Sequence, residues 1–452
     1  MPLVISNTYP LIAVKYFAIF AFVAFCIFIK NQVSLKVKHP FIDEIFHLRQ
    51  CYTYCNYQFD KWDNKITTPP GLYFLGFGYV KVLEYITGIK SLCDDYNVLR
   101  SLNLVGGLIV FPIALHRLKG AYTNQYWSIN IISQPLLFTY YFLFYTDVWS
   151  AVLVVLSLAL AKNHQPWGSA IVGFVSLWFR QTNIVWIAFI LAVYIDGKIQ
   201  RGEYSFIGRV IKFVTTAVSN FFSIIPLLVN FVLFAVFLKM NGGITFGDKD
   251  NHKVGIHLVQ VFYCFTFINF FTWPVWMNRK VLINYGLFIV GSHPLHQILN
   301  AASMFGIKFI IDKFTIVHPF LLADNRHFTF YIFKKLISHK YSQVITIPLY
   351  HFATYNIISS LLRTKRMRLS PIGIIAFLVS VCLTIVPSPL FEPRYYIVPL
   401  ILFRVYITPV HTWSHALEFI WLNSINVLMM LVFFKYEFSW DSEPGSIQRI
   451  IW

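Results

Sequence analysis

Apolar stretches follow one another along almost the whole chain, and most approach the length that a helix needs to cross a lipid bilayer. Such a helix takes about 20 apolar residues. The stretches are 11–29, 98–116, 126–145, 147–161, 168–179, 184–195, 213–238, 257–276, 281–311, 343–361, 371–388, 395–410 and 416–434. They predict one all-α polytopic membrane domain over residues 1–452, with about 12–14 transmembrane helices.

The composition excludes other classes of protein. Hydrophobic residues make up 57% of the chain and charged residues 12%, whereas soluble domains carry roughly 25% charged residues. So few charges cannot cover a water-facing surface, which excludes a soluble enzyme, a disordered chain and a nucleic-acid-binding domain. The net charge of +18 could suggest a polyanionic partner, but the basic residues are spread over many short loops. That distribution favours contact with membrane lipid, and we expect no nucleic acid partner.

Four of the apolar stretches need a further interpretation. The stretches 168–179 and 184–195 are too short to cross alone, so we expect them to meet at a polar break inside a protein-lined cavity. The stretch 281–311 is either one tilted helix or a broken one. The stretch 11–29 could be a signal peptide, but no small-residue cleavage site follows it, and we expect a retained first helix.

Basic loops predict the sidedness of the chain, because positive residues favour the cytoplasmic side. The segments expected there are 116–119, 198–212, 278–280 and 363–368. The remaining polar segments then share the opposite, lumenal side: 30–97, 146–147, 180–183, 239–256, 318–342 and 387–394. The basic stretch 30–38 argues weakly against this orientation.

Segment 30–97 is the largest polar piece and is predicted to be the first lumenal loop. Within it, 71–87 is apolar but contains Lys81 and Glu84, which favours an amphipathic helix in the membrane interface over a crossing helix.

The six cysteines contain no CxxC motif, and Cys51 and Cys55, four residues apart, have marginal geometry for a disulfide. Free thiols are therefore expected.

Asp43 and Glu44 directly follow the basic stretch after the first span. Adjacent carboxylates point to different sides of a helix or strand, so only one can face a cavity, and the other is free to take a structural partner. The one in the cavity could act as a general base on a sugar hydroxyl. The alternative is a cap at the start of a helix, where acids are favourable.

Two further groups of polar residues interrupt apolar stretches. Asp147 could cap a helix or hold an acceptor hydroxyl. Arg180, with Gln181 and Asn183, lies between two short apolar stretches, where a guanidinium needs an anionic partner. That partner is either a substrate phosphate or a carboxylate of the same cavity.

Arg326 and His327, and Glu392 and Arg394, are the remaining candidates. Their cations could hold a lipid phosphate, although contacts with membrane headgroups would explain them as well. The histidines in 247–257 and 293–296 form no closed metal-ligand set, so we expect no metal. No phosphate-binding glycine loop or serine-nucleophile motif is present, and no cofactor is expected. An enzyme of this kind would need an activated donor that is itself a lipid.

A series of motifs covers the chain from Asp43 to Trp452: DEIFHLRQ, WDNKITTPPGLY, FRQTNIVW, GDKDNH, HPFLLADNRHFTFYIF, EPRYY and IQRIIW. In these motifs the sequence resembles the endoplasmic-reticulum α-1,2-glucosyltransferase family of N-glycan assembly. Members of that family transfer the last glucose from dolichyl-phosphate-glucose to the diglucosylated dolichyl-diphosphate oligosaccharide. The resemblance implies a GT-C glycosyltransferase fold with a lumenal active site.

The resemblance also implies roles for individual residues. Asp43 matches the catalytic acid of the first lumenal loop, with Glu44 beside it, and 71–87 matches an interfacial helix. Asp147 falls where the second lumenal loop lies, while Arg180 and Gln181 fall at a lumenal helix break. The reaction would invert the sugar in a single displacement. The alternatives are a sibling GT-C enzyme using another lipid-phosphate sugar, and a multi-pass transporter, for which we find no internal repeat.

Overall fold

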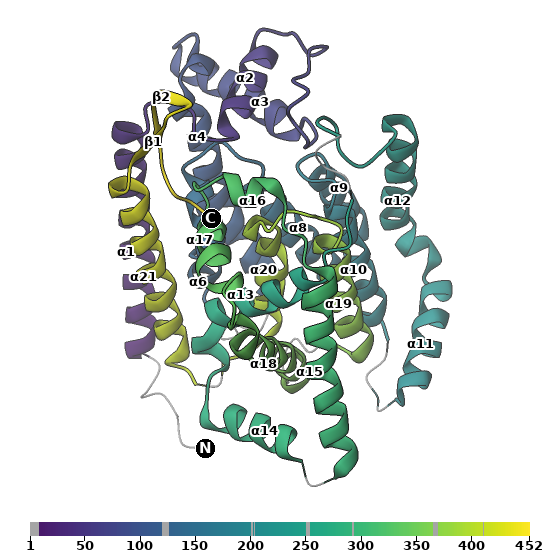
Figure 1. The fold of residues 1–452 in the computed structure, drawn as a ribbon. Helices are drawn as coiled ribbons and strands as arrows, with labels where there is room; N and C mark the ends of the chain where they lie inside the picture. Colours follow the sequence, from purple (N-terminus) through teal and green to yellow (C-terminus); the bar gives the residue numbers. More distant parts are fainter. Residues whose placement is uncertain are drawn as a thin grey trace.

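The computed structural model describes residues 9–119, 126–199, 202, 204–249, 254–291, 293–364, 369–409 and 411–452. Helices make up almost all of the regular structure in these ranges, and one small β-hairpin follows the last helix. Figure 1 shows an upright helical bundle with helices α2 (Glu44–Cys55) and α3 (Gly71–Thr87) at its upper end. The all-α membrane class predicted from the sequence is confirmed.

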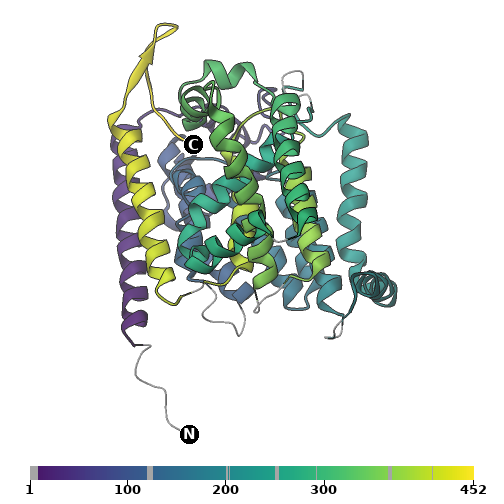
Figure 2. The same ribbon diagram turned by 60° about the horizontal axis from the view of Figure 1, so that its bottom comes forward.

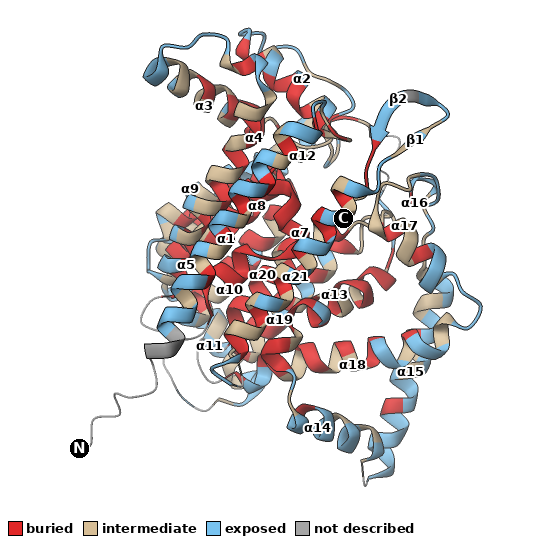
Figure 3. Ribbon diagram, turned by 90° about the vertical axis from the view of Figure 1, so that its left-hand side faces the viewer, coloured by how far each residue is buried: buried red, intermediate tan, exposed pale blue. Residues whose placement is uncertain are grey.

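The outer helices expose large apolar side chains. α1 (Tyr9–Lys36) and α21 (Ser414–Lys435) lie side by side at one edge of the bundle (Figure 1). On α1, Phe17 and Phe20 are 70% and 72% exposed, as is expected of helices that contact lipid. α15 (Pro294–Phe314), α14 (Arg279–Val290) and α12 (Phe221–Asn241) are also largely exposed (Figure 3).

The inner helices carry the core. α8 (Asp147–Lys162), with thirteen of its sixteen residues buried, is the most completely enclosed long helix in the described chain. It packs against α5 (Phe111–Lys119), α9 (Pro166–Leu177), α10 (Asn183–Gly197) and α20 (Ile397–Tyr406). The other inner helices are α13 (Val259–Trp276), α18 (Ser342–Arg363) and α19 (Pro371–Ile385). As predicted, α9 and α10 meet at a break inside the protein.

Four helical segments of the described chain are long and apolar enough to cross a membrane: Ile12–Lys36, Tyr96–Lys119, Phe221–Asn241 and Ser414–Lys435. The second combines α4 (Tyr96–Val105), the π-helical turn η2 (Gly106–Val110) and α5. Shorter apolar helices are α9, α10 and α19. The count of about 12–14 crossings therefore stays a prediction.

The predicted span 126–145 is wrong, because this stretch forms only short elements. They are α6 (Ser128–Ile132), α7 (Pro135–Phe138) and the 3₁₀ turn η3 (Thr139–Tyr141). Pro135 disfavours helical geometry at the residue before it, and Gln134 is extended with ψ 123°. The stretch is buried, and its irregular backbone is tolerated because polar groups of the protein satisfy it.

The predicted span 213–238 is also wrong as a single helix. The chain bends at Asn220, between α11 (Phe206–Ser219) and α12. α11 has no buried residue and lies across the axis of α12, where Figure 2 shows it end-on. For 281–311 the broken alternative is confirmed, since α14 and α15 are separate helices and Pro294 opens the second.

The first polar loop folds at one end of the bundle, opposite α11 and α14 (Figure 1). It begins later than predicted, because residues 30–36 still belong to α1. It contains α2 (Glu44–Cys55), α3 (Gly71–Thr87) and the 3₁₀ turn η1 (Leu92–Asp94). The predicted helix 71–87 is confirmed with the same bounds, and its Lys81 and Glu84 form an ion pair of 2.9 Å.

The expectation of free thiols is wrong for two cysteines. Cys55 at the end of α2 and Cys93 in η1 form a disulfide across 38 residues of sequence. The spacing of the cysteines gave no sign of this pair, because it is the packing of α2 against η1 that brings them together. Cys26, Cys51, Cys264 and Cys382 are free thiols.

The remaining helical elements are short. They are α16 (Pro319–Ala323), α17 (Phe328–Ile332), the π turn η4 (Phe333–Ile337) and the 3₁₀ turn η5 (Pro393–Tyr396). Strands β1 (Phe438–Trp440) and β2 (Glu443–Gln448) form an antiparallel hairpin that the sequence pattern did not predict. The residues after it return to the bundle, where Ile451 pairs with His327.

Candidate active site

The corner between α1 and α2 determines where Asp43 points. Ile42 has a φ of +50°, a left-handed conformation that is strained for a β-branched residue. Tyr145 holds the corner, because its hydroxyl donates to the Phe41 carbonyl at 3.1 Å and accepts from the Asp43 amide at 3.1 Å. Asn103 holds the Tyr145 carbonyl in turn at 2.8 Å. The irregular segment before α8 thus positions the start of α2.

Glu44 points away from Asp43, into the protein. Its buried carboxylate receives two hydrogen bonds from Arg100, at 2.8 and 2.7 Å, and one each from the amides of Phe41 and Phe144, at 3.0 and 2.8 Å. Arg100 also donates to the Val37 carbonyl at 2.9 Å. Glu44 therefore joins α1, α2, α4 and the segment before α8, and it does not line the pocket described next.

A pocket of about 1010 Å³ opens beside Asp43, and its walls come from segments far apart in the sequence. Six of the ten candidate site residues line it: Asp43, Arg180, Arg326, His327, Glu392 and Arg394. The fold thus brings together acids and arginines from the first loop, the α9–α10 break and two later loops.

Arg394 lies between two carboxylates of this pocket. It donates to Asp43 at 3.1 Å and also pairs with Glu392. Burial raises the pKa of the Glu392 carboxyl, but the charge and hydrogen bond of Arg394 outweigh this and lower its pKa to about 2. The Asp43 side chain remains 42% exposed. It is therefore oriented by Arg394 while still accessible to a substrate.

The α9–α10 break supplies a second pair. Arg180 lines the pocket and donates to the buried Asp147 at 2.7 Å. Gln181 donates to the carbonyls of Thr67 and Ile244, at 2.7 and 3.0 Å, and so fixes two loops of the rim. Asn183 bonds Ser150 inside the bundle at 2.9 Å. Asp147, Gln181 and Asn183 thus lie behind the pocket wall rather than in it.

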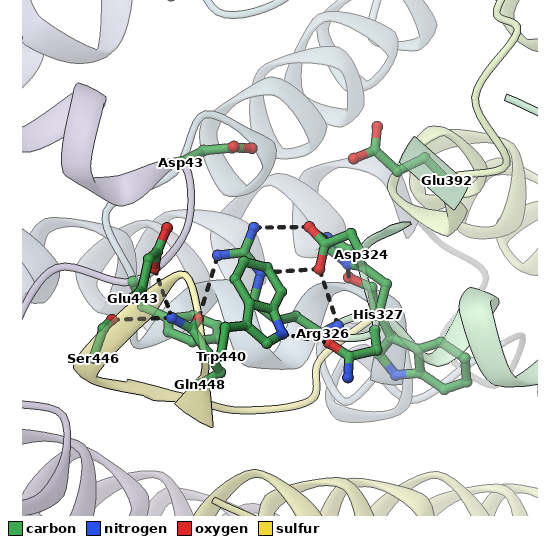
Figure 4. A network of polar contacts seen from close by, with 12 residues as sticks. Asp43, Asp324, Arg326, His327, Glu392, Trp440, Glu443, Ser446 and Gln448 are labelled. Carbon is green, nitrogen blue, oxygen red and sulfur yellow. Dashed lines mark hydrogen bonds and ion pairs between the residues drawn. The ribbon is translucent and has the colours of Figure 1, made fainter. Parts of the chain in front are cut away.

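Arg326 forms the third pair, with Asp324. Its guanidinium donates to both carboxylate oxygens of Asp324, at 2.9 and 2.7 Å (Figure 4). Burial raises the pKa of Asp324, but Arg326 and His327 outweigh that effect and lower it. His327 bonds the Trp452 carbonyl at 3.1 Å. The end of the chain therefore supports this part of the wall.

Two loops of the pocket rim contain the WDNKITTPPGLY and GDKDNH motifs, and they meet at Gly247. A side chain at Gly247 would come within 2.3 Å of the Asn64 carbonyl, so only glycine permits this approach. The Asp248 amide donates to the same carbonyl at 2.8 Å. The GDKDNH segment begins here, but residues 250–253 lie outside the described ranges.

Sequence reasoning missed several pocket residues. The charged or titratable ones are His47, Lys65, Asp248, Asp324, Tyr395 and Asp441. His47 follows Asp43 by one helical turn, and that spacing was the available signal. Its Nδ1 bonds the Tyr73 hydroxyl at 2.7 Å. Lys65 is exposed on the rim, and no carboxylate in the described part of the chain pairs with it. Nothing in its sequence context distinguishes it from a surface lysine.

The burial of His47 predicts a pH dependence of stability. Burial lowers the pKa of its imidazole from 6.5 to about 4, although Asp43 acts in the opposite direction. Below pH 6.5 His47 becomes protonated in the unfolded chain but stays neutral in the folded protein. Stability therefore falls as the pH decreases from about 6.5 to about 4. We expect His47→Asn to show a smaller loss of Tm between pH 7 and pH 5.

The comparison is made by thermal unfolding of both proteins in detergent. Burial also lowers the pKa of His257 to about 4, so this residue contributes to the pH dependence of stability in both the wild type and the variant. Glu392 contributes only below its ordinary value of 4.5. An identical pH dependence in the variant would contradict a neutral, buried His47.

The described residues contain one group with the proximity of metal ligands, Cys51, Cys55 and Cys93. Two of them form the disulfide, so they do not offer thiolates. The pocket itself offers a carboxylate base candidate with arginines around it. Such a pocket suits the transfer of a phosphate-borne group to a hydroxyl, because guanidinium groups stabilise phosphate oxygens.

The fold and pocket define a class: a helical membrane protein whose acidic and basic side chains converge in one pocket at an end of the bundle. Within that class, the chain belongs to the DIE2/ALG10 family, whose model matches residues 37–405.

Relatives of known name are similar over nearly their whole length. A protein of Debaryomyces hansenii is 51% identical over 95% of this chain and 98% of its own. One of Candida albicans is 50% identical over 97% and 100%, and one of Homo sapiens is 29% identical over 93% and 95%. Each is named Dol-P-Glc:Glc(2)Man(9)GlcNAc(2)-PP-Dol alpha-1,2-glucosyltransferase. No solved structure matches the chain.

Proposed function

We propose that this protein transfers glucose from dolichyl-phosphate-glucose, in α-1,2 linkage, to the diglucosylated oligosaccharide on dolichyl diphosphate. This would be the last step in assembling the N-glycan precursor. The observation that carries the proposal is the single pocket in which Asp43 meets Arg394, Arg180 and Arg326. The names of relatives that are 29–51% identical support it.

In the proposed mechanism Asp43 is the general base. It takes the proton from the 2-hydroxyl of the terminal glucose of the acceptor as that oxygen attacks the donor sugar. The donor is β-linked and the product α-linked, so one in-line displacement through an oxocarbenium-like transition state is sufficient. Arg394 orients the Asp43 carboxylate through the contact of 3.1 Å.

The leaving group in this mechanism is dolichyl phosphate. Its developing negative charge would be stabilised by Arg394, Arg326 and Arg180. Each of these arginines forms an ion pair with a different carboxylate in the structure. A phosphate monoester needs no protonation near neutral pH to leave, so the mechanism requires no general acid. It assigns no role to a metal or a cofactor.

The arginines give a prediction about the donor. Arg326→Ala should raise the KM for dolichyl-phosphate-glucose about tenfold or more, because a charge-assisted contact to phosphate is lost. Arg394→Ala should also lower kcat, since Asp43 loses the partner that orients it. Both are measured with purified protein at saturating acceptor.

The control is Arg49→Ala, which removes an arginine whose side chain is 65% exposed outside the pocket and should leave both constants unchanged. If the KM for dolichyl-phosphate-glucose were unchanged in both pocket variants, Arg326 and Arg394 would have a structural role and would not bind the donor. The same assay tests the function itself. Transfer from dolichyl-phosphate-mannose instead would identify a sibling enzyme, and no transfer from any dolichyl-phosphate sugar would contradict the proposal.

We propose further that the protein resides in the endoplasmic reticulum membrane with the pocket facing the lumen. The disulfide supports this orientation, because it lies in the same loop as Asp43 and disulfides persist in oxidising compartments. Helices α11 and α14, which carry the basic residues Arg209, Lys212, Arg279 and Lys280, lie at the opposite end of the bundle (Figure 1). The variant Lys65→Cys, changed at an exposed position of the same loop, should react with a membrane-impermeant thiol reagent only after sealed microsomes are opened. Reaction in sealed vesicles would contradict the orientation.

A further inference from the structure

The hairpin of β1 and β2 forms one side of the pocket rim. Ser439, Trp440, Asp441 and Ser442 all line the pocket, and the hairpin reaches beyond the ends of α1 and α21 (Figure 2). A ligand that leaves the pocket toward water would therefore pass along these residues. None of them was a candidate in the sequence analysis.

The hairpin is held in place by contacts with Asn325 and Arg326, in the loop before α17. The indole nitrogen of Trp440 donates to Asn325 at 2.9 Å, and Arg326 lies over the ring at 4.4 Å from its centre. Gln448 donates to Glu443 at 3.1 Å and accepts from Arg326 at 3.3 Å (Figure 4). These contacts fix the hairpin as part of the pocket wall.

The base of the hairpin is anchored as well. Arg449 is buried and donates to the carbonyl of Phe433 at 2.9 Å and to that of Lys36 at 3.2 Å. It thereby joins the ends of α21 and α1. Two residues further, the Ile451 amide donates to the Arg326 carbonyl at 2.8 Å. Because the rim is already fixed, little conformational entropy is lost there when a ligand binds.

The side chains on the rim have the chemistry that recognises sugars. A pyranose ring offers an apolar face to an indole and hydroxyls to carboxylates and to other hydroxyl groups. Trp440 is half-buried with its ring at the pocket, and Asp441 and Ser442 are exposed beside it. No hydrogen bond or ion pair within the described chain engages the Asp441 carboxylate. It is therefore available to a ligand.

The two proposed substrates differ in what they would bring to this rim. The donor carries one sugar on a lipid phosphate, a group that the largely buried arginines of the pocket suit. The acceptor carries a long, water-soluble oligosaccharide that must extend from the pocket away from the membrane. We propose that Trp440, Asp441 and Ser442 form a binding subsite for the sugar residues of the acceptor oligosaccharide. This inference rests on the proposed function.

The experiment measures both substrates in the purified, full-length protein. Trp440→Ala and Asp441→Asn should each raise the KM for the lipid-linked acceptor about tenfold, the effect of losing one well-placed contact. The KM for dolichyl-phosphate-glucose should stay unchanged. The Glc2Man9GlcNAc2 oligosaccharide, released from its lipid, should inhibit the wild type and inhibit both variants about tenfold more weakly.

Ile447→Ala is the matched control, because Ile447 is 55% exposed on the same hairpin and does not line the pocket. It should leave every constant unchanged. A purely structural Trp440 would act through Arg326 and would raise the donor KM instead, which would overturn the inference for that residue. Asp441 makes no contact with Arg326, so an unchanged acceptor KM in Asp441→Asn would overturn the subsite. A wild-type protein without any glucose transfer would overturn the proposed function, and the subsite with it.

Discussion

Replacing Asp43 by asparagine should lower the rate of glucose transfer by about 10²- to 10⁴-fold, the usual contribution of a general base. Asparagine has the same shape and can still accept a hydrogen bond from Arg394, but it cannot take the proton of the attacking hydroxyl. The variant should unfold at the temperature of the wild type, because the Asp43 side chain is partly exposed and makes one ion pair. Initial rates and thermal unfolding are measured on the same purified sample.

Asp60→Asn is the matched control, since Asp60 is an exposed acid of the same loop outside the pocket. It should keep full activity. Normal turnover by Asp43→Asn would remove Asp43 from the chemistry. The base would then be sought among the other carboxylates of the pocket, of which Glu392 and Asp324 are already paired with arginines.

Replacing the neighbouring Glu44 by glutamine should have the opposite profile, a large loss of stability. The change leaves the buried Arg100 without its charged partner, and breaking such a pair costs about 3–5 kcal/mol. That is a large part of the roughly 5–15 kcal/mol by which domains are stable. We expect a much lower Tm in detergent and less inserted protein.

Two comparisons test this interpretation. Asp312→Asn breaks an exposed pair with Lys308 and should change the Tm little. The double variant Glu44→Gln, Arg100→Met removes both buried charges, keeps an acceptor for the amides of Phe41 and Phe144, and should recover part of the lost stability. A Glu44→Gln protein of normal Tm with no activity would instead place Glu44 in the chemistry.

The sequence predicted the general class of fold well and its irregular parts poorly. Apolar length identified α1, α8, α13, α18 and α21, because burial in lipid or protein demands long apolar runs. It failed at 126–145 and 213–238, where a proline and a bend at Asn220 divide runs that are predominantly apolar. Hydropathy alone does not distinguish a segment buried in protein from one that crosses lipid.

The candidate site shows a similar division. Asp43, Arg180, Arg326 and Arg394 were identifiable because charges beside apolar stretches are costly unless they have a use. The neighbouring acids were not separable from the sequence, since the turn at Ile42 and the position of Arg100 decide that Glu44 faces inward. The rim residues were missed because serine, tryptophan and aspartate are ordinary residues of an exposed hairpin.

The pairing of Ile451 with Arg326 also bears on how the protein matures. Translation proceeds from the amino end at about 5–20 residues per second, so the segment that supports Arg326 emerges on the order of half a minute after Asp43. Until then the first loop can form its disulfide and dock, but the opposite wall has no support. Under the proposed mechanism, a nascent chain should therefore have Asp43 in place before Arg326 can help to bind a substrate, and activity should require the segment that contains Ile451.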